Sequence, residues 1–203
     1  MFSHKSLLSS AAGLLLATSV FAAAPKKYEA ATYQIDPSHS KVGFEIPHLV
    51  ISSVEGRFNK FDGTLVLNDA FEKSTFKANV DVVSVDTGEK KRDEHLASPD
   101  FFDAKKFPAM TFESTEVKGS PEDFKLTGNL TIHGVTKKVT FDSKYLGTVA
   151  DGYGNQKVAF HGKAKINRKD FGLVWSKAVE AGPVVGDEVD LNLSIQAAKP
   201  GKK

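Results

Sequence analysis

The alternation of apolar and polar residues with a period of two is the feature that most constrains the fold of this chain. In residues 76–82 (FKANVDV) and 124–132 (FKLTGNLTI), every second position is apolar or glycine. Successive side chains of a strand point to opposite faces, so these segments are predicted to be strands with one dry face. The same pattern recurs at residues 33–35, 42–46, 54–58, 61–67, 110–114, 139–145, 158–166 and 189–197.

Helical periodicity is nearly absent, and only residues 87–103 are predicted to form a helical insert. We expect two short helices there, with Ser98 as an N-cap and Pro99 at the first helical position. One insert cannot cover a whole sheet, so the dry face must pack on another sheet or close on itself. We favour an all-β, closed antiparallel barrel of about eight strands over a sandwich.

The predicted interior combines large aromatic residues with small ones. The chain has 15 phenylalanines, and many of them fall on the inward phase. The small inward residues either leave a lumen that can hold one ligand, or mark barrel corners and bulges beside a packed core. These small residues are Gly43, Ala78, Gly128, Gly162 and Ala164.

The first 22 residues are predicted to be an export signal. His4 and Lys5 form a basic start, residues 7–21 an apolar core, and we expect cleavage after Ala22, with Ala24 as the alternative. Residues 23–203 would then be a single soluble domain of about 180 residues.

Charge and composition argue against several classes of partner and chemistry. The formal net charge is +2 with scattered lysines, so no nucleic acid is expected. No apolar stretch is long enough for stable membrane insertion, and the absence of cysteine removes thiolate chemistry. The histidines lack metal-ligand spacing, and no hydrolase or nucleotide motif is present, so we predict no metal site and no catalytic residue.

Three segments concentrate polar candidates. In the insert, Arg92, Asp93 and His95 either form an ion-pair network that pins the insert, or rim an opening and contact a polar head group. Arg168 belongs either to a solvated turn or to the same opening, where Phe171 and Trp175 would form an apolar gate. His39 is either a surface residue of an Asx turn or a ligand contact.

A set of short segments, in a fixed order from about residue 32 to residue 197, resembles the YceI-like proteins, also called the polyisoprenoid-binding or lipid-binding YceI domain. The segments are residues 35–40 (IDPSHS), 54–58 (VEGRF), 61–63 (FDG), 84–87 (SVDT), 92–96 (RDEHL), 100–103 (DFFD), 107–108 (FP), 128–137 (GNLTIHGVTK) and 168–172 (RKDFG).

The resemblance implies an extended, lipocalin-like barrel with an elongated apolar tunnel, secreted to the periplasm and often homodimeric. It also implies an amphiphilic ligand with a long isoprenoid tail, such as a quinone, its phenolic precursor or a polyprenyl phosphate. No catalysis is implied, and the bound lipid takes the place of a cofactor.

We therefore expect a carrier that sequesters such a lipid. The expected apolar lining is Phe44, Ile46, Phe58, Phe76, Phe101, Phe112, Leu130, Phe160, Phe171 and Trp175. The expected polar rim is His39, Arg92, Asp93, His95 and Arg168. Two alternatives remain: a lipid-modifying enzyme with Asp93 and His95 as acid and base, and a solid-core interaction module of the cell envelope.

Overall fold

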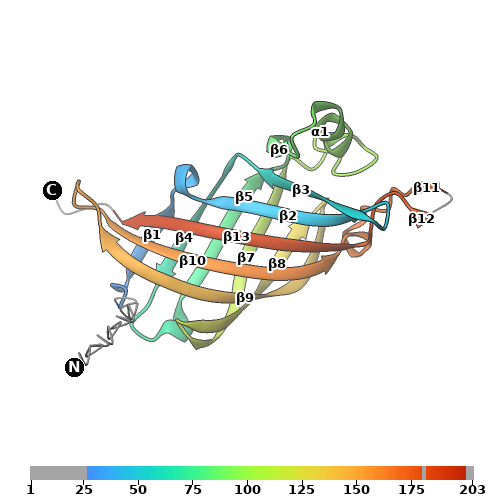
Figure 1. The fold of residues 1–203 in the computed structure, drawn as a ribbon. Coiled ribbons are helices and arrows are strands. Elements are labelled where there is room, and N and C mark those ends of the chain that lie inside the picture. Colours follow the sequence, from blue (N-terminus) through green and yellow to red (C-terminus); the bar gives the residue numbers. More distant parts are fainter. Residues whose placement is uncertain (1–26, 180–181, 200–203) are drawn as a thin grey trace, which may run out of the picture.

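A computed structural model describes residues 27–179 and 182–199, and the predicted export signal lies outside these residues. Its main element is an antiparallel sheet that closes into an eight-stranded barrel, because β1 pairs with both β4 and β13 (Figure 1). The predicted all-β barrel is thus confirmed. Its strands are, in order around the barrel, β1 (Ala31–Ile35), β4 (Phe61–Leu67), β5 (Thr75–Asp81), β7 (Ala109–Ser120), β8 (Asp123–Ile132), β9 (Val135–Ala150), β10 (Gln156–Asn167) and β13 (Glu188–Lys199).

One edge of β13 pairs with two strands, β1 near its C-terminal end and β2 (Lys41–His48) along its first half, so the two ends of the barrel differ. Ile35 of β1 pairs with Ala197, while β2 pairs with the stretch from Asp190 to Ser194. A short 3₁₀ helix, η1 (Pro37–His39), separates β1 from β2. From there β2 forms a hairpin with β3 (Ser52–Phe58), and β3 ends against β6 (Val85–Asp86).

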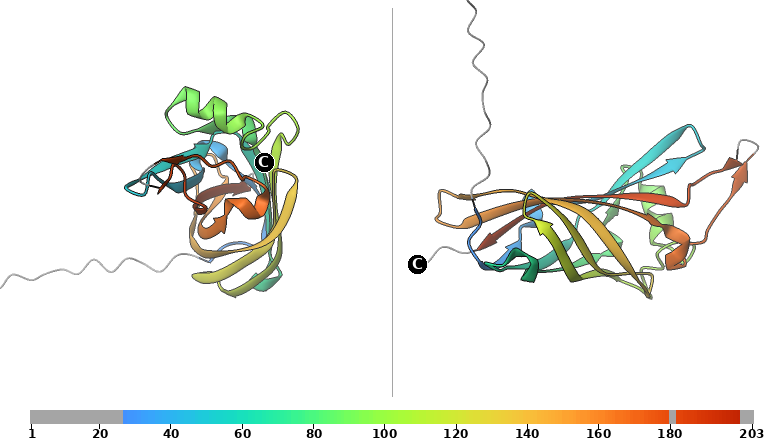
Figure 2. Two further views of the ribbon diagram at one scale, coloured as in Figure 1. Left: turned by 90° about the vertical axis from the view of Figure 1, so that its right-hand side faces the viewer. Right: turned by 90° about the horizontal axis from the view of Figure 1, so that it is seen from below.

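The β2–β3 hairpin extends beyond the barrel at one end, beside the small β11 (Ala178–Val179) and β12 (Gly182–Pro183) ribbon (Figure 2). We call this the hairpin end. The opposite end, where the turn between β9 and β10 lies, is called the far end (Figure 1). The remaining short helices are η2 (Phe71–Lys73), η3 (Val82–Ser84) and η4 (Arg168–Phe171).

The predicted pair of helices in the insert is wrong in one respect. A single helix forms, α1 (Lys90–Ala97), and the carboxylate of Glu89 caps it by accepting from the Lys91 and Arg92 amides. Ser98 ends this helix instead of starting another, because its hydroxyl donates back to the His95 carbonyl at 2.7 Å. Residues 98–106 then form turns.

Candidate functional site

The barrel encloses a cavity of about 370 Å³. This volume lies within the range of roughly 300–1,000 Å³ found for small-ligand sites. Phenylalanines from strands all around the barrel contribute to the wall, together with the inward face of β13. Among these wall residues are Phe44, Phe76, Phe112, Phe160, Leu191, Leu193 and Ile195.

An aromatic end cluster closes the cavity at the far end; it consists of Tyr28, Phe71, Phe124, Tyr145 and Phe160. Phe71 meets Phe124 edge to face with ring centroids 4.9 Å apart, and Tyr145 lies 5.3 Å from Phe160. The Tyr28 hydroxyl donates to the Asn68 carbonyl at 2.8 Å, and burial raises the pKa of Tyr145 to about 12. Large buried rings with satisfied hydroxyls make this end of the cavity blind.

At the hairpin end the wall is formed by α1, the β2–β3 hairpin and the chain around residue 184. Apolar side chains still predominate here, and Arg92, His95 and Arg168 border the same space. The apolar members are Ile46, Val54, Leu96, Phe101, Phe102, Trp175, Val184 and Val185. The polar groups on this border are the ones that could meet a ligand's head group.

His95 lies within an aromatic group at this end. Its Nε2 is 2.9 Å from a carboxylate oxygen of Asp100. Its ring meets Phe101 and Trp175 edge to face, at centroid distances of 5.0 Å and 5.2 Å. The imidazole is therefore held in place by the Asp100 carboxylate on one side and by two aromatic rings on the other.

Arg92 and Asp93 both bind Thr87 at the start of the insert. The Arg92 guanidinium donates to the Thr87 hydroxyl at 2.7 Å and to its carbonyl at 2.9 Å. The Asp93 carboxylate accepts from the Thr87 amide at 2.9 Å and from its hydroxyl at 2.6 Å. Shared contact with Thr87, rather than pairing with each other, is how Arg92 and Asp93 fix the start of α1 beside β6, while His95 contacts Asp100 within the insert.

Arg168 braces the segment that carries Trp175. It is only 3% exposed and donates to the carbonyls of Gly186 at 2.7 Å, Leu173 at 2.5 Å and Trp175 at 2.8 Å. It also forms an ion pair of 3.1 Å with Asp187. Burial lowers the pKa of the Arg168 guanidinium, whereas hydrogen bonding from Lys169 is the main cause that lowers the pKa of Asp187.

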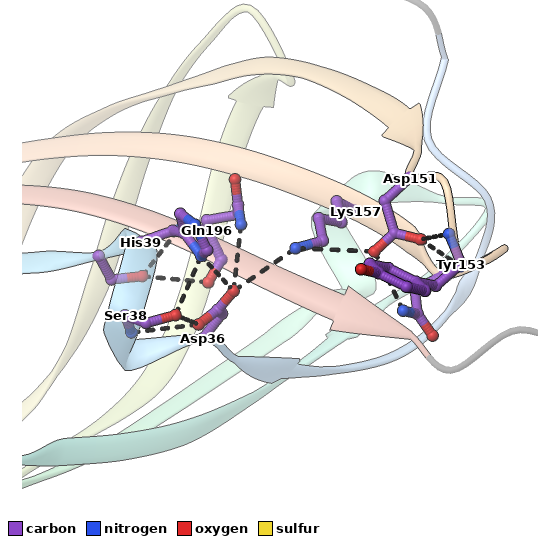
Figure 3. A network of polar contacts seen from close by, with 9 residues as sticks. Asp36, Ser38, His39, Asp151, Tyr153, Lys157 and Gln196 are labelled. Carbon is purple, nitrogen blue, oxygen red and sulfur yellow. Dashed lines mark hydrogen bonds and ion pairs between the residues drawn. The ribbon is translucent and has the colours of Figure 1, made fainter.

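His39 belongs to a different group, the seam network, which consists of Asp36, Ser38, His39, Lys157 and Gln196 (Figure 3). The Asp36 carboxylate accepts from the Ser38 hydroxyl and from the Gln196 amide, and its Oδ2 lies 2.8 Å from His39 Nδ1. Lys157 approaches the same carboxylate at 3.6 Å. The Ser38 hydrogen bond is the largest cause that holds the pKa of Asp36 well below its usual range.

Most of the residues predicted to line the ligand site border the cavity. These are Phe44, Ile46, Phe58, Phe76, Phe101, Phe112, Leu130, Phe160 and Trp175, with Arg92, His95 and Arg168 among the predicted rim. Three predicted residues lie away from the wall. Phe171 is buried in the core, where η4 places its ring, Asp93 is turned toward Thr87, and His39 belongs to the seam network.

The wall also contains residues outside the predicted lining. Leu191, Leu193 and Ile195 lie on the inward phase of the alternation at residues 189–197, which is the sequence signal for them. Val184 and Val185 lie in no alternating segment, and no sequence signal indicated them.

Two other kinds of site are absent from the described residues. They contain no group of three or more His, Asp or Glu side chains placed to hold a metal ion. No helix within residues 27–179 and 182–199 is long and apolar enough to cross a membrane.

Known proteins resemble this chain in both sequence and fold. The family model for the YceI-like domain matches residues 33–197. Protein YceI of Escherichia coli O17:K52:H18 is 39% identical, over 96% of this chain and 98% of that protein. The crystal structure of the Campylobacter jejuni YCEI protein is 32% identical with a TM-score of 0.66, covering 88% of this chain and 99% of that one.

A more distant structure has the same architecture. The polyisoprenoid binding domain from Saccharophagus degradans has a TM-score of 0.61 at 17% identity, over 83% of this chain and 98% of that one. At this identity the likeness shows the fold alone. Because the family model and the E. coli relative cover most of the sequence, this chain belongs to the YceI-like domain family.

Proposed function

We propose that this protein binds one amphiphilic lipid with a long isoprenoid tail, holding the tail in the barrel cavity and the polar head at the hairpin end. The observation that carries the proposal is the cavity itself. It is about 370 Å³ in volume, blind at its aromatic far end and bordered by Arg92 and His95 where α1 meets it. An apolar, blind space with polar groups at one end matches a molecule with one tail and one head.

Burial of the tail would supply most of the affinity. Apolar area removed from water is worth about 25 cal/mol per Å², and part of this offsets the ordering of a flexible chain. Arg92 and His95 can bind a phosphate, a phenol or a quinone oxygen, since guanidinium and imidazole groups pair with anions and hydroxyls. Tail length and head-group chemistry would then be selected at opposite ends of the cavity.

The ligand class and the setting belong to the proposal. The S. degradans domain, described as polyisoprenoid binding, has the same fold and suggests a guest of this kind. We propose a carrier or sequestering role in the periplasm for a domain of residues 23–203 that follows an export signal. A homodimer stays a prediction.

Two rival functions have less support. An acid–base pair of Asp93 and His95 is disfavoured because residues two apart on a helix do not face each other, and Asp93 is engaged by Thr87. A solid-core interaction module is disfavoured by the size of the cavity.

The test combines extraction with cavity filling. Organic extracts of the native protein, analysed by mass spectrometry, should contain a prenyl lipid.

A Cβ added at Gly162 would meet only side chains, at 3.5 Å or more, so Gly162→Leu should project into the cavity and abolish lipid retention without unfolding the barrel. Gly152→Leu is the matched control, because Gly152 lies in the open turn between β9 and β10, where an added Cβ would meet no atom within 4 Å. Equal retention by both variants, or an empty native protein that also fails to take up added prenyl lipid, would contradict the proposal.

A further inference from the structure

The tip of the β2–β3 hairpin has an unusual backbone for its sequence. Leu49, Val50 and Ile51, called the apolar tip below, connect the two strands. Leu49 has a φ of 52° and Val50 a φ of 66°, both in the left-handed region. Hairpins normally place Asn and Gly in two such positions, because a Cβ there is strained and a β-branched residue is disfavoured most. The chain thus retains large apolar side chains here at a cost in stability.

Two of these three side chains, Val50 and Ile51, are exposed to solvent, and Leu49 is half-buried. Val50 is 68% exposed and Ile51 is 88% exposed, and the nine residues from Ile46 to Val54 contain no Asp, Glu, Lys or Arg. Strain and exposure of apolar groups both lower stability, and persistent strain of this kind is concentrated at functional sites. A requirement for apolar groups at the tip would account for both features.

The apolar tip lies beside the hairpin end of the cavity. The Leu49 amide donates to the Val184 carbonyl at 3.0 Å, and the Val184 amide donates to the Lys177 carbonyl at 2.9 Å. His48 at the base of the tip borders the cavity and bridges to Val185, which also borders it. Val50 and Ile51 themselves are not part of the cavity wall, so their role is separate from holding the ligand.

We propose that the apolar tip inserts into the surface layer of a lipid bilayer and holds the hairpin end of the cavity against the membrane. Docking of this end at a membrane would let lipid pass between the bilayer and the cavity, so the inference rests on the proposed lipid-binding function. Lys177 is exposed, and its carbonyl accepts from the amide of Val184, the residue whose own carbonyl binds the Leu49 amide. In the docked state Lys177 would face anionic head groups.

The size of the tip favours a membrane over a protein partner. A stable protein interface uses roughly 20–30 residues on each side, whereas binding at a bilayer surface scales with the apolar area buried about 5–10 Å into it and with attraction to anionic lipids, so it has no such minimum size. A projecting hairpin with three apolar residues fits the second description.

Vesicle flotation with the full mature chain tests the proposal. Vesicles of phosphatidylcholine with and without phosphatidylglycerol should bind the wild-type protein, more strongly when the anionic lipid is present. Val50→Ser with Ile51→Ser should weaken binding about tenfold or more, because two apolar side chains no longer leave water. Leu146→Ser with Val149→Ser is the matched control: both residues are exposed, lie on β9 away from the hairpin end, and should leave binding unchanged.

A second variant separates loss of docking from loss of folding. Leu49→Asn with Val50→Gly supplies residues suited to the left-handed backbone, so it should raise the melting temperature while still weakening vesicle binding. Cavity occupancy, measured in solution with a fluorescent prenyl probe, should be the same in all these proteins.

Each outcome is decisive for one of the two proposals. Failure of the wild-type protein to bind vesicles, or equal binding by the tip variants, overturns the docking inference. Dissociation of a wild-type oligomer in the tip variants, measured by light scattering, overturns it in favour of a protein interface. Normal flotation with no probe uptake would instead refute the proposed cavity function.

Discussion

At the scale of single residues, the small positions on the inward phase differ in what surrounds them. A Cβ at Gly128 would lie 2.4 Å from the Phe112 ring and 2.6 Å from the Glu113 carbonyl. A Cβ at Gly162 would meet Ser143, Leu193 and Phe141 at 3.5–3.7 Å, which is ordinary contact. Gly128 therefore makes room for a ring, while Gly162 leaves part of the lumen open.

The same substitution should have opposite effects at these two glycines. Gly128→Ala should lower the free energy of unfolding by about 1–3 kcal/mol, because Phe112 and the backbone of β7 must move. Gly162→Ala should be neutral or stabilising by up to about 1 kcal/mol, since the added methyl group fits and the unfolded chain loses freedom. Urea denaturation of both variants is the measurement, and equal destabilisation would show that Gly162 does not face free space.

Arg168 should be irreplaceable even by lysine. Its planar group reaches three carbonyls and Asp187 at once, which an ammonium cannot do. Arg168→Lys should therefore cost about 3 kcal/mol or more of stability. Trp175 is the only tryptophan, so its fluorescence should also shift to longer wavelength in the folded variant as its segment loosens. A folded variant with unchanged emission and unchanged urea midpoint would contradict the bracing role.

At the scale of elements, the seam network joins the first strand to the last. The β1–β13 pairing is short, with Gln34 and Ile35 as its registered residues, and Asp36 follows directly. Side-chain contacts of Asp36 with Gln196 of β13 and Lys157 of β10 therefore supplement a short ladder of backbone hydrogen bonds. The seam should be the part of the barrel most sensitive to acid.

Asp36 should give the barrel a pH-dependent stability. Its folded pKa is depressed, so the contribution is complete above the unfolded pKa of about 3.9 and is lost as the pH falls through the folded value. Asp36→Asn should be less stable than wild type by about 1–3 kcal/mol at pH 7, with a smaller difference at pH 2–3. Urea midpoints across this range measure the effect, with Asp62→Asn, an exposed carboxylate on β4, as the control. A difference that does not change with pH would contradict the assignment.

The sequence predicted the strands better than the turns and the insert. Period-two alternation located every barrel strand, because one dry face per strand determines the pattern. It could not show that the hydroxyl of Ser98 would bond backward to His95 and end a helix, since N-cap and C-cap serines look alike in sequence. Nor could it show that Phe171 would enter the core while Trp175 borders the cavity, because η4 and the left-handed Gly172 set both directions.

At the scale of the whole molecule, the two ends of the barrel perform different tasks. The far end is sealed by aromatic rings and tied by the seam network, whereas the hairpin end carries the insert, Trp175 and the apolar tip. In a cavity that is closed at one end, the depth limits the length of the ligand tail. The position of the aromatic end cluster should therefore set the longest tail that fits.

Phe160→Ala should lengthen the cavity toward Tyr145 and shift the preference to longer tails. Phe160 borders the cavity and also packs on Tyr145 and Phe76, with ring centroids 5.3 Å and 5.7 Å apart. Its removal should cost about 3–5 kcal/mol of stability but open space that continues from the existing cavity. Displacement of a fluorescent lipid by prenyl alcohols of increasing length measures the preference. Phe107→Ala is the control, because the Phe107 ring packs on His133 and is not part of the cavity wall, so its removal should leave the preference for tail length unchanged. The same length preference in both variants would mean that the aromatic end cluster does not set the depth of the cavity.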